Sequence, residues 1–255
     1  KAMVFGGGNV LNKAYSTQVI GVGNTVTGSD LNFVYKESPE IGKITNWAEQ
    51  IAARSADIWN QYDASLRNNG TQLNYVDGYY STLKNGQNDY MIGTANELTG
   101  DDASKNKSNI VFGDYHKLNN GKNNIIIGSA DGSVEEKATP FVDDVYAEKH
   151  ITTEITGQKQ HAENLTDAVI IGHNADVQEN GGVALGSDST VVDSDKSGKD
   201  LDKHGFGYEK RNASDADYVW QSNLASVSVG SAGHTRRMQM LLPVLMRQMR
   251  STWPS

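Results

Sequence analysis

A short apolar segment that ends in glycine recurs along the whole chain, and this recurrence limits what the chain can fold into. Each copy has three or four apolar or small residues before its glycine and small or polar residues after it. The copies are Met3–Gly6, Gln18–Gly21, Tyr90–Gly93, Ile110–Gly113, Ile125–Gly128, Val169–Gly172, Val183–Gly186 and Val227–Gly230. Successive glycines lie 14, 15 or 20 residues apart where copies adjoin. This period predicts stacked coils, each with two short strands and two turns, because one coil cannot bury its apolar face alone.

The residues of these segments are mostly β-branched or aromatic, which favours β-strands. Neighbouring strand residues point to opposite faces, yet the three positions before the glycine are apolar in most copies. Both faces should therefore be buried, one in the core of the coil and the other against further copies of the chain. The residues predicted to form this core and this interface are Ile20, Ile92, Phe112, Ile126, Ile127, Ile170, Ile171, Leu185, Val227 and Val229.

Composition agrees with a turn-rich β protein and excludes some classes of function. The 255 residues include 26 glycines and 4 prolines, and the formal net charge of −8 argues against broad nucleic-acid binding. The absence of cysteine excludes disulfides and thiolate sites, and it fits export through an oxidising compartment. No apolar run of about 18 residues is present, so we expect no transmembrane helix. The first residues already have the pattern of a strand, so we expect the sequence to be a fragment of a longer one.

Long intervals between the copies are predicted insertions, which often carry the binding function of repeat proteins. The first, 24–89, should contain a helix over about 46–66, where apolar residues follow a 3.6-residue spacing, and a hairpin over Tyr75–Tyr80 with an Asp–Gly turn. Two others span 129–167 and 187–224, so the repeats occupy 1–23 and 90–237. The candidate ligand-binding surface consists of Trp47, Trp59, Tyr62, Tyr75, Tyr79 and Tyr80.

The chain has no catalytic motif and no dense set of metal ligands. None of the six histidines belongs to an HExxH or similar pattern. Gly21-Val22-Gly23 lacks a third glycine at the spacing of a dinucleotide loop, so the repeat explains it better. A weak calcium candidate is formed by Asp193, Asp195 and Ser197, but His204 stands where the last ligand, a glutamate, is needed. We therefore expect no catalytic residue and no cofactor.

The most specific residues are those near the end of the repeats, Trp220–Ser222, Ala225–Gly230 and His234–Arg237. Together they resemble the end of the head domain of trimeric autotransporter adhesins, the family typified by the YadA adhesin. Heads of that family end in a Trp-x-Ser stretch, a Ser-Val-Ser-Val-Gly strand and a Thr-Arg segment. The strand–glycine segments upstream resemble the head repeats of the same family, so the resemblance covers most of the chain apart from the insertions.

This resemblance implies an all-β fold, a left-handed parallel β-roll of 14–15-residue repeats that is homotrimeric, here with a helix-containing insertion. The left hand is implied by the resemblance alone, since parallel crossovers are generally right-handed. The resemblance also implies a position on the bacterial cell surface, held at the outer membrane by a separate anchor that this sequence lacks. The implied partners are other copies of the chain and a host matrix protein, a host cell-surface receptor or other microbial cells.

The resemblance stops after Arg237, and residues 238–255 look nothing like the family's neck, NVAAGT…DAVNVAQL. One permitted coding of this tail, read from its third base, translates as Ala-Asn-Val-Ala-Ala-Gly-Thr-Asp-Ala-Thr-Asp-Ala-Val-Asn-Val-Ala-Gln, which matches that neck. We infer that one base was lost near Arg237 and that the tail is a non-native, frameshifted product. Sequencing the coding DNA tests this inference, and an uninterrupted frame with different codons would contradict it.

The leading hypothesis is an adhesin head, not an enzyme, that attaches through many weak contacts presented in several copies. The first alternative is a structural spacer without a ligand of its own. The second is a polysaccharide-active enzyme or acyltransferase on a β-helix, although the six-residue period of left-handed acyltransferase helices is absent. Adhesion after deletion of 24–89 separates the first alternative from the leading hypothesis, and a turnover assay separates the second.

Overall fold

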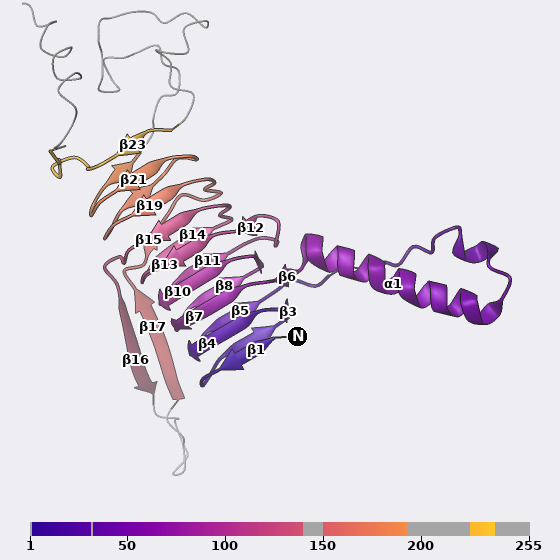
Figure 1. Cartoon of the computed structure of the whole chain (residues 1–255). Helices are drawn as coiled ribbons and strands as arrows, with labels where there is room; N and C mark the ends of the chain where they lie inside the picture. Colours follow the sequence, from indigo (N-terminus) through magenta and orange to yellow (C-terminus); the bar gives the residue numbers. More distant parts are fainter. Residues whose placement is uncertain (1, 32, 140–149, 193–224, 238–255) are drawn as a thin grey trace, which may run out of the picture.

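The computed structural model describes residues 2–31, 33–139, 150–192 and 225–237. In this part of the chain, successive coils stack into a β-roll, and each strand of the roll pairs in parallel with strands of the adjacent coils (Figure 1). The described residues are mostly β, with large parallel sheets and a single α-helix, as the repeat predicts. None of the described helices is both long and apolar enough to span a membrane.

Three parallel sheets form the sides of the roll. The largest, with nine strands, holds β1 (Met3–Phe5), β4 (Gln18–Val22), β7 (Tyr75–Tyr79), β10 (Tyr90–Thr94), β13 (Ile110–Phe112), β15 (Ile125–Ile127), β19 (Val169–Ile171), β21 (Val183–Leu185) and β23 (Val227–Ser228). The second holds β2 (Val10–Asn12), β5 (Thr25–Thr27), β8 (Thr82–Lys84), β11 (Glu97–Thr99), β14 (His116–Asn119) and β18 (Lys159–Gln160). The third holds β3 (Ala14–Tyr15), β6 (Thr71–Gln72), β9 (Gly86–Gln87) and β12 (Asn106–Lys107), and β20 (Asp176–Val177) pairs separately with β22 (Thr190–Val191). Several coils therefore contain three strands, and the expectation of two strands per coil was wrong for them.

The core is a column of apolar side chains that come from the nine-stranded and the six-stranded sheets of successive coils. In the nine-stranded sheet from β4 to β21, the residue two places before the strand glycine points inward and is fully buried, as in Val19, Met91 and Ile126. Leu83, Leu98 and Leu118 of the second sheet pack against this column. Because the core is only one side chain deep, each coil is stabilised mainly by the coils next to it.

The strand glycines also form a column, because adjacent coils approach too closely there for a side chain. A Cβ on Gly93 would lie 1.9 Å from the carbonyl oxygen of Gly113, and a Cβ on Gly113 would lie 1.6 Å from that of Gly128. Both Gly93 (φ +131°) and Gly113 (φ +152°) also have positive φ, which residues with a side chain rarely adopt. The glycine of the repeat is therefore required by coil stacking.

Two columns of polar side chains run inside the corners of the roll and satisfy buried backbone groups. In the first, Asn74 Oδ1 accepts from the Asp89 N–H (3.0 Å), Asp89 Oδ1 from the Asn109 N–H (2.8 Å), and Asn109 Oδ1 from the Asn124 N–H (3.2 Å). The second column consists of Asn9, Asn24, Ser81, Asn96, His116, His161 and Asp176. Such ladders explain why the sequence is rich in asparagine where one coil turns into the next.

In the part of the chain that the structure describes, two insertions leave the roll. The arm (residues 28–70) joins β5 to β6 and contains η1 (Ile41–Lys43) and α1 (Trp47–Asn69), so the helix predicted over 46–66 is longer at its C-terminal end. Figure 1 shows α1 projecting away from the roll. The second insertion is an antiparallel hairpin of β16 (Ser133–Thr139) and β17 (His150–Thr156), which follows β15 and precedes β18.

The hairpin predicted over Tyr75–Tyr80 was wrong. These residues belong to β7, which pairs in parallel with β4 on one side and β10 on the other. Gly78 lies in the glycine column, where a Cβ would be 2.3 Å from the Gly93 carbonyl oxygen. Tyr75–Gly78 is thus another copy of the strand–glycine segment, and the first insertion is 28–70 instead of 24–89.

Candidate self-association surface

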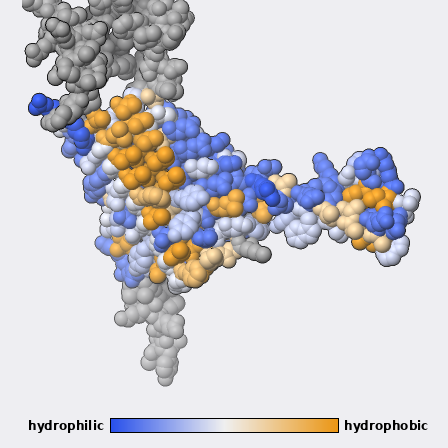
Figure 2. Space-filling model, in the orientation of Figure 1, coloured by the Kyte–Doolittle hydropathy of each residue, from blue (hydrophilic) through white to orange (hydrophobic). Residues whose placement is uncertain are grey.

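The outward side of the nine-stranded sheet, here called the outer face, is an exposed apolar surface. Strand parity turns the residues one and three places before each strand glycine outward when the residue between them points to the core. Among these positions in the central and C-terminal coils, six apolar residues are 36–41% exposed: Ile92, Phe112, Ile125, Ile127, Ile171 and Leu185. Figure 2 shows the resulting hydrophobic area over β13, β15, β19 and β21. A monomer therefore leaves one face of these strands in water, although the sequence predicts burial of both.

The residues predicted as scaffold divide between the core and the outer face. Ile126 and Ile170 are fully buried, while Ile20 and Val229 are half-buried. The others are exposed apolar residues of the same strand set, namely Ile92, Phe112, Ile127, Ile171, Leu185 and Val227. The structure thus separates side chains that stabilise one chain from side chains that are free to contact another.

A polar cluster of Tyr75, Asp77 and Tyr90 interrupts the outer face. Asp77 lies one place before its strand glycine, between Ile20 on β4 and Ile92 on β10 in the pairing register. The Tyr75 hydroxyl donates to Asp77 Oδ2 over 3.4 Å, and the Tyr75 and Tyr90 rings lie 6.5 Å apart between centroids. Asp77 was missed from the sequence because its coil was read as a hairpin; the pattern Tyr-Val-Asp-Gly was the available signal.

The arm carries a second exposed apolar surface. Residues before α1 run back along one side of the helix, where the Arg54 guanidinium binds Glu37 through two hydrogen bonds (2.8 and 3.0 Å) and the Tyr35 hydroxyl donates to Asp57 (3.0 Å). Asn46 caps the helix by accepting from the Ala48 and Glu49 N–H groups. No residue of α1 is buried, so the helix leaves apolar side chains in solvent, whereas Ile41 of η1 is buried.

The predicted aromatic ligand surface does not form one patch. Trp47 and Trp59 on α1 are 74% and 69% exposed, and Tyr62 packs edge-on against Trp59 and Phe33. Tyr75 lies instead on the outer face of the roll. The remaining two tyrosines, Tyr79 and Tyr80, lie at the end of β7 and contact the hairpin.

Glu136 of β16 joins the hairpin to the roll. Its Oε1 accepts from the hydroxyls of Tyr79 (3.0 Å) and Tyr80 (2.6 Å), whose rings contact each other edge-on. The hydrogen bond to Glu136 is the main reason that the pKa of Tyr79 is raised to about 12. The same hydrogen bonds lower the pKa of Glu136, so the carboxylate stays ionised and binds both hydroxyls.

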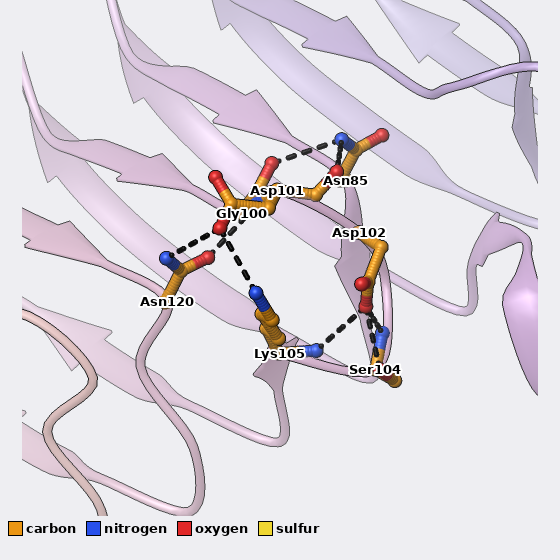
Figure 3. A network of polar contacts seen from close by, with 7 residues as sticks. All are labelled: Asn85, Gly100, Asp101, Asp102, Ser104, Lys105 and Asn120. Atoms are coloured by element: carbon orange, nitrogen blue, oxygen red, sulfur yellow. Dashed lines mark hydrogen bonds and ion pairs between the residues drawn. The ribbon is translucent and has the colours of Figure 1, made fainter.

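An acidic loop between β11 and β12 has its carboxylates engaged within the chain (Figure 3). Asp101 receives hydrogen bonds from Lys105 Nζ and Asn120 Nδ2, both over 3.1 Å. Asp102 Oδ1 accepts from the Ser104 and Lys105 N–H groups over 2.9 and 3.2 Å. The hydrogen bond from Lys105 is the main cause that lowers the pKa of Asp101, and a further hydrogen bond from the Ser104 hydroxyl is the main cause that lowers the pKa of Asp102. These contacts give the loop a structural role at a corner of the roll.

In the described ranges, no group of three or more His, Asp or Glu side chains converges in a way that could hold a metal ion. The calcium candidate of Asp193, Asp195 and Ser197 lies outside these ranges, as do Trp220–Ser222 and the tail 238–255. A cavity of about 470 Å³ lies at the base of the arm, lined in part by Arg67, Gln87 and Lys107. Gln87 Nε2 donates a hydrogen bond to the Arg67 carbonyl oxygen at this cavity. The cavity therefore lies where α1 meets the roll.

No protein-family model matches the chain, and no curated protein matches it.

Proposed function

We propose that this chain is the head of a bacterial cell-surface adhesin, which works as a homotrimer and attaches to host matrix, host receptors or other microbial cells. The proposal takes the roll to be left-handed, as in the YadA-like heads that the sequence resembles. It assigns assembly to the outer face and ligand binding to the insertions. The observation that carries it is the exposed apolar outer face over the central and C-terminal coils, together with an arm that exposes two tryptophans.

The outer face supports assembly because its apolar side chains recur once per coil. Parallel strands lie about 4.8 Å apart, so these side chains form rows with that spacing. A surface that fits between such rows needs the same spacing, and another copy of the chain has it. Removing this face from water would contribute about 25 cal/mol for each Å² of apolar surface buried, and the entropic cost of association is subtracted from this gain.

The arm supports attachment because its aromatic side chains are exposed without any role in the roll. Tryptophan and tyrosine supply most of the binding energy in many protein interfaces. Each contact can be weak when several copies are presented together, since linked sites bind far more tightly than single ones. We therefore place the ligand-binding surface on α1, around Trp47 and Trp59.

The test uses a chain without its arm. In the next coil a single residue, Asn85, with φ +53°, connects β8 to β9 where the arm connects β5 to β6. Replacing residues 28–70 by one asparagine should keep the roll folded and abolish binding to matrix proteins and to partner cells. Sedimentation of the same protein reports whether the trimer forms without the arm.

A point-variant pair sharpens this test. Trp47→Ser combined with Trp59→Ser should weaken binding by about tenfold or more, whereas Glu49→Ser, on the same helix, should leave it unchanged. Unchanged adhesion of the armless chain would contradict the role of the arm, and failure of the intact head to bind any partner would favour a spacer. A sedimentation result of only monomers would contradict the assembly.

A further inference from the structure

The third sheet carries a row of outward polar side chains at the base of the arm. The row consists of Tyr15, Gln72, Gln87, Lys107 and Lys122, which pair from coil to coil. Strand parity gives the direction of the row, because Asn106, which precedes Lys107, is fully buried. Figure 1 shows α1 reaching the roll beside β6 of this sheet, so the end of the helix lies over the row.

Two glutamines of the row hold the last turn of α1 and keep an acceptor free. Gln72 Nε2 donates to the Leu66 carbonyl oxygen over 3.0 Å, and Gln87 Nε2 donates to that of Arg67. The two residues are only 5% and 2% exposed, and both line the cavity at the base of the arm. Among the residues that the structure describes, none donates a hydrogen bond to either Oε1. An amide oxygen in such a place is satisfied by water or by a ligand.

Positive charge lies at the same cavity. Lys107 lines it, and Lys122 is the next residue of the row, on a coil about 4.8 Å away. Arg67 is already paired with Asp63 over 2.7 Å. The two lysines, in contrast, make no ion pair within the described ranges, although other lysines of the roll do. Two like charges on adjacent coils oppose each other, and an anion between them removes that repulsion.

The other walls of the cavity suit a sugar ring. Leu66 and Leu73 supply apolar surface, and Asn88 supplies a further amide. Hydroxyl groups both donate and accept hydrogen bonds, so a sugar can use the free oxygens of Gln72 and Gln87 while its C–H groups pack on the leucines. The cavity volume of about 470 Å³ falls within the range of small-molecule sites and accommodates one or two rings.

We propose that the cavity at the base of the arm binds a sugar that carries an anionic group, with the anion at Lys107 and sugar hydroxyls donating to Oε1 of Gln72 and Gln87. Lys122 strengthens the attraction from the next coil. At 1.5 Å per residue, Trp47 lies about 30 Å away at the other end of α1. The site is therefore distinct from the tryptophan surface, and it requires neither that surface nor self-association.

The test measures binding of three sugars to the full chain by ligand-observed NMR titration: 3′-sialyllactose, 3′-sulfolactose and neutral lactose. Lys107→Gln should weaken binding of the anionic sugars by about tenfold, because a hydrogen bond to a charged group is lost. Lys107→Arg keeps the charge and should retain most of the affinity. Lys36→Gln removes the same charge from an exposed residue of the arm and is the matched control. Trp47→Ser combined with Trp59→Ser should leave sugar binding unchanged.

Each outcome bears on the site. Binding of sialyllactose identifies a carboxylate as the anion, and binding of sulfolactose alone identifies a sulfate; both support the site when Lys107→Gln weakens them. Lactose that binds as tightly as the other two, or equal losses in Lys107→Gln and Lys36→Gln, contradicts the role of Lys107. Absence of binding by all three sugars overturns the site and leaves the proposed adhesin function standing. Circular dichroism establishes that each variant is folded.

Discussion

His116 and His161 lie stacked inside the roll, with Nδ1 of His116 3.1 Å from Nε2 of His161. His116 Nε2 is 2.6 Å from the Gly128 carbonyl oxygen, so it carries the proton of that hydrogen bond and its Nδ1 accepts from His161. His161 Nδ1 is in turn 2.8 Å from Asp176 Oδ1. The array thus holds one proton more than two neutral imidazoles and a carboxylate.

The first prediction concerns acid stability and His116. Burial is the main cause that lowers the pKa of His116 to about 4, from a usual value of 6.5. Between these values the unfolded chain binds a proton that the folded chain does not, so His116 makes stability fall as the pH drops from 6.5 to 4. His116→Asn, which copies Asn96 of the same column, should flatten this dependence by up to about 1.4 kcal/mol per pH unit. Urea unfolding at several pH values measures it, and an unchanged slope would contradict the prediction.

The second prediction concerns Asp89, the carboxylate in the first polar column. Burial raises its pKa to about 7 despite the hydrogen bonds from Asn109, and in the described part of the chain its Oδ2 has no partner. The folded chain binds this proton between pH 3.8 and 7 and the unfolded chain does not, so stability falls as the pH rises through that window. Asp89→Asn should therefore stabilise the roll above pH 7 by up to about 4 kcal/mol.

Chemical denaturation at pH 5 and pH 8 checks the second prediction, with Asp101→Asn in an exposed ion pair as the control. The control should change stability by less than about 1 kcal/mol at either pH. A destabilised Asp89→Asn variant at pH 8 would show that the ladder needs the carboxylate.

The third prediction tests the glycine column. Gly113→Ala places a methyl group within the backbone of the next coil and should cost about 3 kcal/mol or more, if the chain folds at all. Gly42→Ala is the matched control, because a Cβ there meets nothing within 4 Å, and its effect should be within about 0.5 kcal/mol. Thermal unfolding compares them, and equal melting temperatures would contradict the stacking argument.

The fourth prediction tests the contact between the hairpin and the roll. Glu136→Gln removes the charge that stabilises the protonated phenol of Tyr79, so the pKa of Tyr79 should fall from about 12 toward its usual value of 10. Titration of the phenolate absorbance measures this change, with Glu135→Gln on the same strand as the control. If the two titrations coincide, Glu136 does not bind Tyr79 in solution.

The sequence predicts the strands of the roll well where the local pattern fits a single type of structure. The strand–glycine copies locate most strands of the nine-stranded sheet, because glycine is the residue that close coil stacking requires. Tyr75–Gly78 was misread because an Asp–Gly pair also suits a hairpin turn, and only the pairing with β4 and β10 decides between them. The strands of the other two sheets are polar and two to four residues long, too short to show a period.

The outer face was predicted in part. The apolar positions on both sides of each strand indicate a second contact surface, but periodicity alone cannot say that Ile126 points inward and Ile127 outward. The helix of the arm was predicted from the sequence. Its separation from Tyr75, Tyr79 and Tyr80 was not, because it depends on which residues begin and end each coil. Contacts between the roll and an insertion, such as Tyr79 with Glu136, depend on distances that a sequence does not contain.

The bond between β7 and the hairpin also has a consequence for cooperativity. In a stack where each coil touches only its neighbours, unfolding can begin at an end and proceed coil by coil. Glu136 follows β15, three strands along the sheet from β7, so its bonds to Tyr79 and Tyr80 bridge coils that are not neighbours. The segment between them should open as one unit, and hydrogen exchange should be uniform from β7 to β15 and faster toward β1.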